Sequence, residues 1–402
     1  MRVVLAFSGG LDTSVLTCLL QEKYGAEVIT LTLDLGQNKD FSEIAWRSEK
    51  LGAIEHYTID AKMEFAANHV LPALKANALY EDKYPISSAL SRPLIALKLV
   101  EIAKKVDADA VAHGCTGKGN DQVRFEITIK ALAPELKIIA PVRELGLTRD
   151  WEVNYALKKN LPVKIKSDPY SIDENLWGRS IECGILEDPA AEPPEEVFEW
   201  TVNPIDAPDK PEYVTIEFNE GCPISINGEK LDLVNLIKKL NFIGGKHGVG
   251  RIDHIEDRVI GIKSREVYEA PAAIILIEAH RELEKLTLTR QEVLFKKIID
   301  WKWTNLIYEG LWVDPLRSDL EAFINSTQMR VSGEVKVKLF KGHCIIVGRN
   351  SPYSLYNKEL ATYEAWSTFN QKLSEGFIEL WGLQSVIANE ILKMKKEQFT
   401  LH

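Results

Sequence analysis

Short apolar runs alternate with longer segments of helical periodicity over the first 165 residues. Strands are predicted at Val3–Phe7, Glu27–Leu33, Glu55–Ile59, Ala110–His113 and Ile138–Val142. Helices are predicted at Val15–Lys23, Phe41–Leu51, Met63–Ala78, Leu90–Val106 and Trp151–Lys159. This alternation indicates an α/β fold with a doubly wound parallel sheet. Ligands of such sheets bind at the carboxyl ends of the strands.

The pattern changes in the second half, which is expected to be α+β. Residues 188–211 are rich in Pro, Glu and Asp and are expected to be irregular. Strands are then predicted at Tyr213–Phe218, Pro223–Ile226, Gly333–Phe340 and His343–Val347. Helices are predicted at Leu231–Phe242, Ala272–Leu286 and Gln291–Ile307. A final amphipathic helix, Gln371–Lys396, is of the kind that docks on another surface.

Composition narrows the class of protein. The 402 residues are 45% hydrophobic and 27% charged, which is typical of a soluble globular enzyme. A net charge of −10 argues against a nucleic-acid partner. No run approaches the ~20 apolar residues that span a bilayer, so no membrane partner is expected. The first apolar run is expected to be a strand rather than a signal peptide.

The cysteines indicate a reducing compartment. Five are scattered along the chain without a CxxC pair: Cys18, Cys115, Cys183, Cys222 and Cys344. This spacing argues against structural zinc and disulfides, and we expect a cytoplasmic protein.

The segment Ser8–Ser14, SGGLDTS, lies between the first strand and the first helix. A Gly-Gly turn before a helix N-terminus favours anion binding, because unpaired N–H groups and the helix dipole point outward. The P-loop lysine and glycine spacing are missing. The segment resembles the PP-motif of ATP pyrophosphatases, which cleave ATP between the α- and β-phosphates. An ordinary tight turn is the alternative.

A second polar segment, His113–Glu126, follows the fourth predicted strand. Its side chains suit a zwitterion, with Asp121 for an ammonium and Arg124 or Thr116 for a carboxylate. Asn120 suits either group. The alternative is a solvated loop that caps a helix at Asn120 or Asp121.

Two further segments are less specific. Ser171 and Ser180 could bind a polar ligand, although a serine that caps a helix is the more common case. The segment Gly244–Asp253 contains four glycines with Lys246, His247 and Arg251. It suggests a flexible cationic loop over phosphates, with a solvated face as the alternative. Its spacing does not fit a dinucleotide fingerprint.

Together these segments resemble the argininosuccinate synthase family. The resemblance rests on AFSGGLDTS, ALYEDKYP, HGCTGKGNDQVRFE, DENLWGRS, the segment from Gly245 to Ala272, and GRNSPYSLY. It implies an ATP-dependent ligase that joins citrulline to aspartate through a citrullyl-adenylate and releases AMP and pyrophosphate. It also implies an ATP-binding domain at 1–165, a synthetase and multimerisation domain at 166–364, and an oligomerisation helix at 365–402 of a homotetramer.

The resemblance assigns roles by motif. Catalytic roles fall on Asp12, Asp121 and Arg124. ATP would be held by Ala6, Phe7, Ser8, Gly9, Gly10, Leu11, Asp12, Thr13, Ser14, Leu33 and Gly114. Citrulline would contact Tyr84, Asn120, Arg124, Ser171, Ser180, Glu256 and Tyr268. Aspartate would contact Thr116, Asn120 and Asp121. No metal-ligating set is predicted, and Mg²⁺ would be carried on the ATP phosphates.

Two positions depart from the family pattern. Ala89 stands where some members place a serine that contacts citrulline, and Leu33 stands where a small alanine usually lies near adenine. Two alternatives also stay open. Another PP-motif pyrophosphatase, such as a tRNA thiolation enzyme, is expected to have paired catalytic cysteines and a basic face. An ATP-binding sensor without turnover would not need the polar second half.

Overall fold

The computed structural model describes residues 1–163 and 170–400. The expected domain boundary at residues 165 and 166 lies outside these described residues. The chain divides into two compact units, Met1–Tyr353 and Ser354–His402.

A parallel sheet forms the first part of the larger unit. Its strand order is β3-β2-β1-β4-β5. The strands are β1 Arg2–Ala6, β2 Glu27–Asp34, β3 Glu55–Asp60, β4 Ala110–Ala112 and β5 Lys137–Ile139. All strands run parallel, but the order in which the chain adds them changes from one side of β1 to the other between β1 and β4. Ligands of such folds bind at this switch point. The expected α/β class is confirmed.

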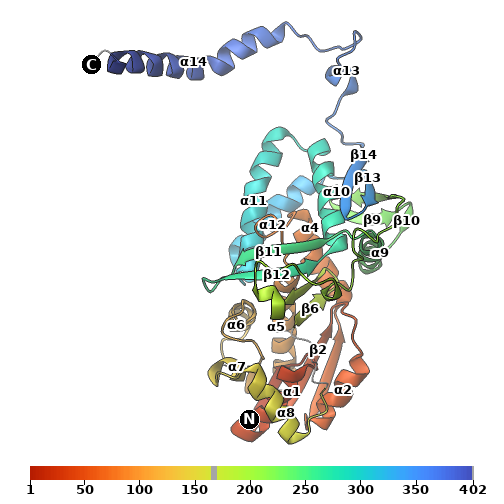
Figure 1. The fold of residues 1–402 in the computed structure, drawn as a ribbon, viewed down its shortest axis with the longest axis vertical. Helices are drawn as coiled ribbons and strands as arrows, with labels where there is room; N and C mark the ends of the chain where they lie inside the picture. The colour runs from red at the N-terminus through yellow and green to blue at the C-terminus, as the bar shows by residue number, and fades with distance from the viewer. Residues whose placement is uncertain (164–169, 401–402) are drawn as a thin grey trace. The chain divides into compact units, whose positions relative to one another are not determined.

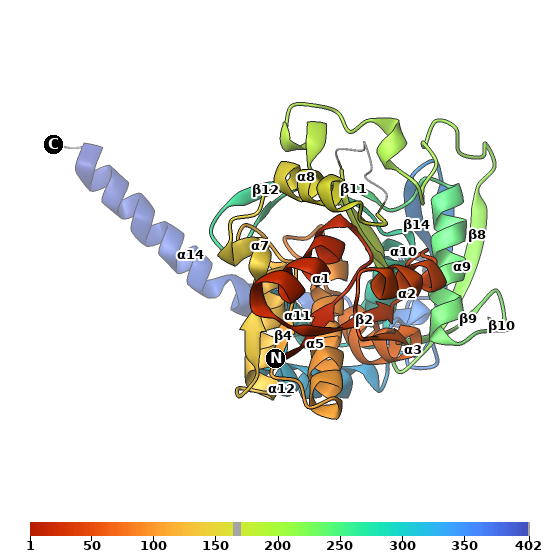
Figure 2. The ribbon, with the colours of Figure 1, turned by 90° about the horizontal axis from the view of Figure 1, so that it is seen from below.

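Helices cover both faces of this sheet. They are α1 Leu11–Tyr24, α2 Phe41–Lys50, α3 Lys62–Phe65, the π-helical turn η1 Ala66–Val70, α4 Leu71–Lys75, α5 Ser87–Lys105, α6 Asp121–Leu132, α7 Pro141–Glu144 and α8 Arg149–Lys159. Val3 and Leu5 of β1 pack in one cluster with residues of α1 and α8, whereas Val4 packs with residues of α5. Figures 1 and 2 show α1, α2 and α8 grouped together. Successive side chains of β1 therefore pack against the helices on opposite faces of the sheet.

One predicted strand is too long at its carboxyl end. The strand expected at Ile138–Val142 ends at Ile139, because Pro141 begins the short helix α7. Proline has no N–H for a sheet ladder but fits the first turn of a helix.

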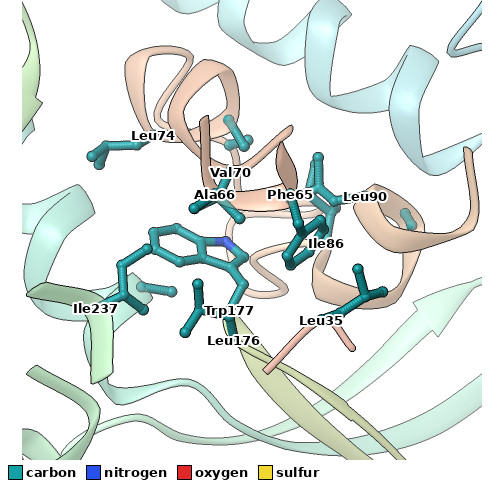
Figure 3. Packing of buried hydrophobic residues seen from close by; sticks show 14 of the residues in the cluster. Leu35, Phe65, Ala66, Val70, Leu74, Ile86, Leu90, Leu176, Trp177 and Ile237 are labelled. Carbon is teal, nitrogen blue, oxygen red and sulfur yellow. The ribbon is translucent and has the colours of Figure 1, made fainter. Parts of the chain in front are cut away.

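A four-stranded antiparallel sheet lies next in the chain, with the order β11-β12-β7-β6. Its strands are β6 Ser171–Asn175, β7 Gly178–Glu182, β11 Arg251–Asp257 and β12 Lys263–Glu269. The turn between β6 and β7 is held in the core by Trp177, which is fully buried. Figure 3 shows its indole among Ala66, Val70 and Ile237. Asn175 Nδ2 donates to the Ser87 carbonyl at 2.9 Å, which joins the hairpin to the start of α5.

A five-stranded sheet with the order β10-β9-β8-β13-β14 and several helices complete the larger unit. The strands are β8 Glu212–Asn219, β9 Cys222–Ile226, β10 Glu229–Lys230, β13 Gly333–Phe340 and β14 His343–Asn350. The helices are η2 Gly184–Glu187, η3 Glu195–Val197, α9 Leu233–Lys246, α10 Pro271–Thr287, α11 Arg290–Tyr308 and α12 Pro315–Gln328. The α+β character predicted for this half is confirmed, including the hairpins β8–β9 and β13–β14.

The smaller unit contains α13 Lys358–Ala361 and the long helix α14 Leu373–Thr400. The rest of this unit leaves the large apolar side chains of α14 exposed, including Leu373, Phe377, Leu380 and Trp381. Phe377 and Trp381 stack on each other with 5.4 Å between ring centroids. None of the helices in the described ranges is long and apolar enough to cross a membrane.

Candidate active site

The turn after β1 leaves the N-terminus of α1 open. Gly9 has a φ of +73°, and a Cβ there would lie 2.9 Å from Ile44 Cγ1. Gly10 is the N-cap residue and supplies no capping side chain. The first-turn N–H groups of α1 are therefore available to an anion. Ser8 Oγ lies 3.2 Å from Thr13 Oγ1, so two hydroxyl groups gather at the same turn.

Acidic and basic side chains flank this turn. Asp12 Oδ1 accepts a hydrogen bond of 2.8 Å from Arg149 Nη1. Glu152 of α8 is buried, and burial, reinforced by the charge of Asp12, raises the pKa of its carboxyl to about 8. The N-terminus of α1 therefore lies beside a cation and a carboxylate pair that favours a bound proton or cation.

The loop after β4 packs directly against α1. A Cβ on Gly114 would lie 3.2 Å from Leu16 Cδ1, so glycine permits the close approach of this loop to α1 at the switch point. The helix α6 then begins at Asp121, and its N-cap residue, Asn120, makes no side-chain capping hydrogen bond. Its first turn carries most of the polar groups of the second segment.

A cavity of about 300 Å³ brings most of the predicted site together. Its lining includes these predicted residues: Asp12, Tyr84, Gly114, Thr116, Asn120, Asp121, Arg124, Ser171, Ser180, Glu256 and Tyr268. The remaining predicted ATP residues do not line this cavity: Ala6, Phe7, Ser8, Gly9, Gly10, Leu11, Thr13, Ser14 and Leu33. All but Leu33 belong to β1, the turn after it or the start of α1, next to Asp12.

The side chain of Leu33 is buried in the core. Its carbonyl accepts a hydrogen bond from Gln37 Nε2 at 2.6 Å. The predicted contact of Leu33 with adenine stays a prediction. Ala89 is also fully buried, whereas the neighbouring Ser88 lines the cavity and donates to Asp173 Oδ2 at 2.7 Å.

Two arginines hold Asp121. Its Oδ2 accepts from Arg92 Nε at 2.9 Å and its Oδ1 accepts from Arg124 Nη1 at 3.0 Å. Burial disfavours the charged carboxylate, but the charges of Arg92 and Arg124 outweigh this effect and lower the pKa of Asp121. Arg92 also reaches Asp173 Oδ2 at 2.9 Å. The two guanidinium groups and two carboxylates form one fixed network beside the cavity.

Two tyrosines hold Glu256 on β11. Tyr268 donates to its Oε2 and Tyr308 donates to its Oε1, each at 2.6 Å. The ring of Tyr84 stacks on that of Tyr268 with 4.1 Å between centroids. Burial raises the pKa of Tyr84 to about 12, so this hydroxyl stays protonated at neutral pH. Glu256 is thus a buried carboxylate with both oxygens oriented.

A second acidic pair lines the cavity near Arg258. The guanidinium Nη2 of Arg258 donates to Glu182 Oε2 and Glu266 Oε1, each at 2.8 Å. Burial and the neighbouring Glu182 raise the pKa of Glu266 to about 8. Burial also raises the pKa of Glu182. The raised pKa values mean that this pair favours a bound proton or a neighbouring cation such as Arg258.

Sequence reasoning missed several residues of this site. Those that line the cavity are Ser88, Arg92, Asp173, Glu182, Arg258 and Glu266, and Tyr308 lies directly behind it. Arg92 could have been noticed as the one charged residue among the first eleven residues of α5. The carboxylates of β7 and β12 gave no such signal, because alternating charges on strands usually face solvent.

Two segments differ locally from what the sequence suggested. Ser171 and Ser180 lie on strands β6 and β7, which excludes the alternative of a helix cap, and their contact with citrulline stays a prediction. The glycine-rich segment 244–253 is not a flexible loop, because its first residues end α9 and its last residues begin β11. Lys246 pairs with Glu212 at 2.8 Å, and Arg251 is bound to Glu195. Its glycines permit close packing instead, since a Cβ on residue 245 would lie 2.0 Å from the carbonyl oxygen of residue 200.

Comparisons with known proteins show the family of this chain. Residues 2–162 match the Arginosuccinate synthase N-terminal HUP domain, and residues 170–388 match the Arginosuccinate synthase C-terminal domain. The chain belongs to the argininosuccinate synthase family. The family resemblance expected from the sequence is confirmed, and the family match covers both the parallel sheet and the antiparallel sheets.

Individual relatives match over almost their whole length. The argininosuccinate synthase of Pyrococcus furiosus is 64% identical over 98% of this chain and 95% of its own. That of Halalkalibacterium halodurans is 58% identical over 99% and 97%. A solved U34-tRNA thiolase, NcsA from Methanococcus maripaludis, is 16% identical over 42% of this chain and 60% of its own, with a TM-score of 0.26. That last likeness is too weak to support an argument about this family member.

Proposed function

We propose that this protein is an ATP-dependent ligase that joins L-citrulline to L-aspartate in arginine biosynthesis. The reaction yields argininosuccinate, AMP and pyrophosphate through a citrullyl-adenylate. The observation that carries the proposal is the single cavity that joins Asp12 of the PP-type turn to Asn120, Arg124 and Glu256. Membership of the argininosuccinate synthase family supports the choice of substrates.

ATP binds at the turn between β1 and α1. The uncapped helix N-terminus and the hydroxyl groups receive its phosphates. The proposed ATP residues are Ala6, Phe7, Ser8, Gly9, Gly10, Leu11, Asp12, Thr13, Ser14, Leu33 and Gly114. Mg²⁺ neutralises phosphate charge when it is bound with ATP. Among the described residues no group of three or more His, Cys, Asp or Glu side chains is arranged to hold a metal ion. An Mg²⁺ ion carried on ATP would take most of its ligands from phosphate oxygens and water.

The amino acids occupy the rest of the cavity. Citrulline contacts Tyr84, Asn120, Arg124, Ser171, Ser180, Glu256 and Tyr268, and aspartate contacts Thr116, Asn120 and Asp121. The charges match the ligands, because Arg124 can bind a carboxylate and Glu256 an ammonium. These roles come from the family motifs, and the residues that receive them all line the same cavity.

Chemistry proceeds in two displacement steps. The ureido oxygen of citrulline attacks the α-phosphorus of ATP, a P–O bond forms, and pyrophosphate leaves. The amine of aspartate then attacks the ureido carbon, a C–N bond forms, and AMP leaves with the C–O bond pair. Before this attack the aspartate ammonium loses a proton to a base. The proposed catalytic residues Asp12, Asp121 and Arg124 act by positioning and by charge stabilisation.

We further propose a cytoplasmic homotetramer. The cysteines support a reducing compartment, because all five are free thiols in the structure. The exposed apolar side chains of α14 support association, since isolated helices are stabilised mainly by packing of an apolar face.

Pyrophosphate release tests the proposal. With ATP and aspartate present, addition of citrulline is expected to start pyrophosphate release. Omission of citrulline is the control. Release that is independent of citrulline would point to another pyrophosphatase, and ATP binding without release would point to a sensor.

A further inference from the structure

Tyr308 lies behind the cavity rather than in it. It is the last residue of α11, it is fully buried, and it does not belong to the cavity lining. Its hydroxyl nevertheless contacts two residues that do line the cavity. Asn120 Nδ2 donates to Tyr308 Oη at 2.9 Å, and Tyr308 Oη donates to Glu256 Oε1 at 2.6 Å. This side chain therefore links α6 to β11.

The direction of these hydrogen bonds is determined by chemistry. A carboxylate only accepts, so the single hydroxyl proton of Tyr308 points toward Glu256. The other end of Asn120 is also fixed, because its Oδ1 accepts from the Val259 N–H at 2.9 Å. The Asn120 amide thus has one orientation, in which its amino group faces Tyr308. Its second N–H remains to be offered to a carboxylate.

The ring of Tyr308 has little freedom to move. It stacks on Tyr80 with 3.5 Å between centroids and an interplanar angle of 5°. The backbone carbonyl of Tyr308 accepts from Arg124 Nε at 3.1 Å. Gly310 then turns the chain with a φ of +82°, and a Cβ there would lie 3.0 Å from Arg124 Cα. One residue is consequently in contact with Asn120, Arg124 and Glu256.

We infer that Tyr308 is a positioning residue for the amino-acid end of citrulline. Its hydroxyl orients the Glu256 carboxylate toward the α-ammonium. The Asn120 amide keeps a second hydrogen bond, from the Val259 N–H, so its orientation depends less on Tyr308. The inference rests on the proposed function, because it takes citrulline as the ligand at this end of the cavity. Tyr308 touches no reacting atom, so it acts through Glu256.

Removal of one hydroxyl tests this inference. Tyr308→Phe keeps the ring and its stacking but deletes both hydrogen bonds. The KM for citrulline is expected to rise about 5- to 30-fold, while the KM values for ATP and aspartate change less than about twofold. Tyr80→Phe is the matched control. It deletes a hydroxyl from the stacked partner ring, whose own hydrogen bond goes to the Asp257 carbonyl at 2.9 Å.

A substrate analogue distinguishes a positioning role of Tyr308 from general damage to the site. 5-Ureidopentanoate is citrulline without the α-amino group, and it can be measured as an inhibitor against citrulline. Its inhibition constant is expected to differ less than about twofold between the unaltered protein and Tyr308→Phe, since Glu256 then has no ammonium to bind. Equal losses for citrulline and the analogue would overturn the inference.

A double variant gives an independent check. In a Glu256→Gln background, Tyr308→Phe should add less than about twofold to the citrulline KM, because two residues that act as a unit are not additive. Full additivity, or an equal effect of Tyr80→Phe, would contradict the inference. Absence of citrulline-dependent pyrophosphate release in the unaltered protein would instead overturn the proposed function itself and this inference with it.

Discussion

Arg92 on α5 and Asp121 on α6 form an ion pair, with 2.8 Å between Nη2 and Oδ2. Arg124 binds the other oxygen of the same carboxylate. The residue proposed to bind the aspartate ammonium is therefore already neutralised by two cations. Its remaining lone pairs can still accept from a ligand, since a carboxylate has about four such sites.

Replacement of Asp121 should separate the two half-reactions. Asp121→Asn keeps the shape and removes the charge, so the apparent affinity for aspartate should fall about 30- to 150-fold. A single-turnover burst of pyrophosphate with ATP and citrulline alone should survive. Asp173→Asn is the control, because Asp173 also binds Arg92 but is not a proposed aspartate ligand. Lost adenylation with unchanged aspartate affinity would contradict the assignment.

Isotope transfer should reveal the route of the first step. Citrulline labelled with ¹⁸O on its ureido oxygen should pass the label to AMP, because that oxygen attacks the α-phosphorus and later leaves with AMP. Mass spectrometry of AMP and pyrophosphate measures this. Label found only in water or in pyrophosphate would exclude the citrullyl-adenylate.

A buried charge cluster between α10 and α11 should contribute strongly to the free energy of unfolding. Lys296 Nζ lies 2.8 Å from Asp300 Oδ2 and 3.0 Å from Glu284 Oε1. Lys296→Met should lower the free energy of unfolding by about 3–5 kcal/mol, because it leaves buried carboxylates without their cation. Urea unfolding at pH 7 measures this. Addition of Asp300→Leu should recover part of the loss, and a loss below about 1 kcal/mol would contradict the account.

The Glu126 carboxyl should contribute stability that depends on pH. Hydrogen bonding to His113, together with Arg143, lowers its pKa from 4.5 to about 2. Because the folded value is depressed, the contribution is present above about pH 4.5 and is lost as the pH falls through about 2. Glu126→Gln should cost about 1–2 kcal/mol at pH 7 and little near pH 2. Thermal unfolding across this range measures it, with the exposed Glu135→Gln as control. A pH-independent difference would contradict the linkage.

Truncation should test the role of α14. Deletion after residue 364 removes the whole helix, and we expect a lower association state in sedimentation experiments. Deletion after Lys396 removes only the last residues and serves as the control. An unchanged molecular mass after the longer deletion would show that α14 packs within its own subunit.

Local patterns predicted the parallel sheet and the hairpins β8–β9 and β13–β14, but not the four-stranded sheet of β6, β7, β11 and β12. Apolar runs such as Val3–Phe7 lie in the parallel sheet, and glycine and hydroxyl residues lie in the turn that follows. The segment 244–253 misled because glycines that permit close packing have the same spacing as glycines in a ligand loop.

Contacts between residues that are far apart in the sequence could not be predicted from local patterns. Nothing near Tyr308 in the chain indicates that its hydroxyl reaches Glu256, because that contact depends on where α11 ends relative to β11. The pairing of Glu182 with Glu266 around Arg258 likewise arises from the register of an antiparallel sheet. Resemblance to family motifs identified candidate residues that lie within continuous segments. The residues that support them from other parts of the chain could be identified only from the structure.

The cavity draws its lining from positions as far apart as Asp12 and Tyr268, and Tyr308 supports it from behind. A ribosome that adds about 5–20 residues per second therefore completes the nucleotide turn about 15–60 s before Tyr308 is synthesised. During that interval the residues proposed to bind the two amino acids, from Tyr84 to Tyr268, are also synthesised, but the tyrosine that supports Asn120 and Glu256 is not. The order of translation therefore makes this supporting contact the last part of the site to form.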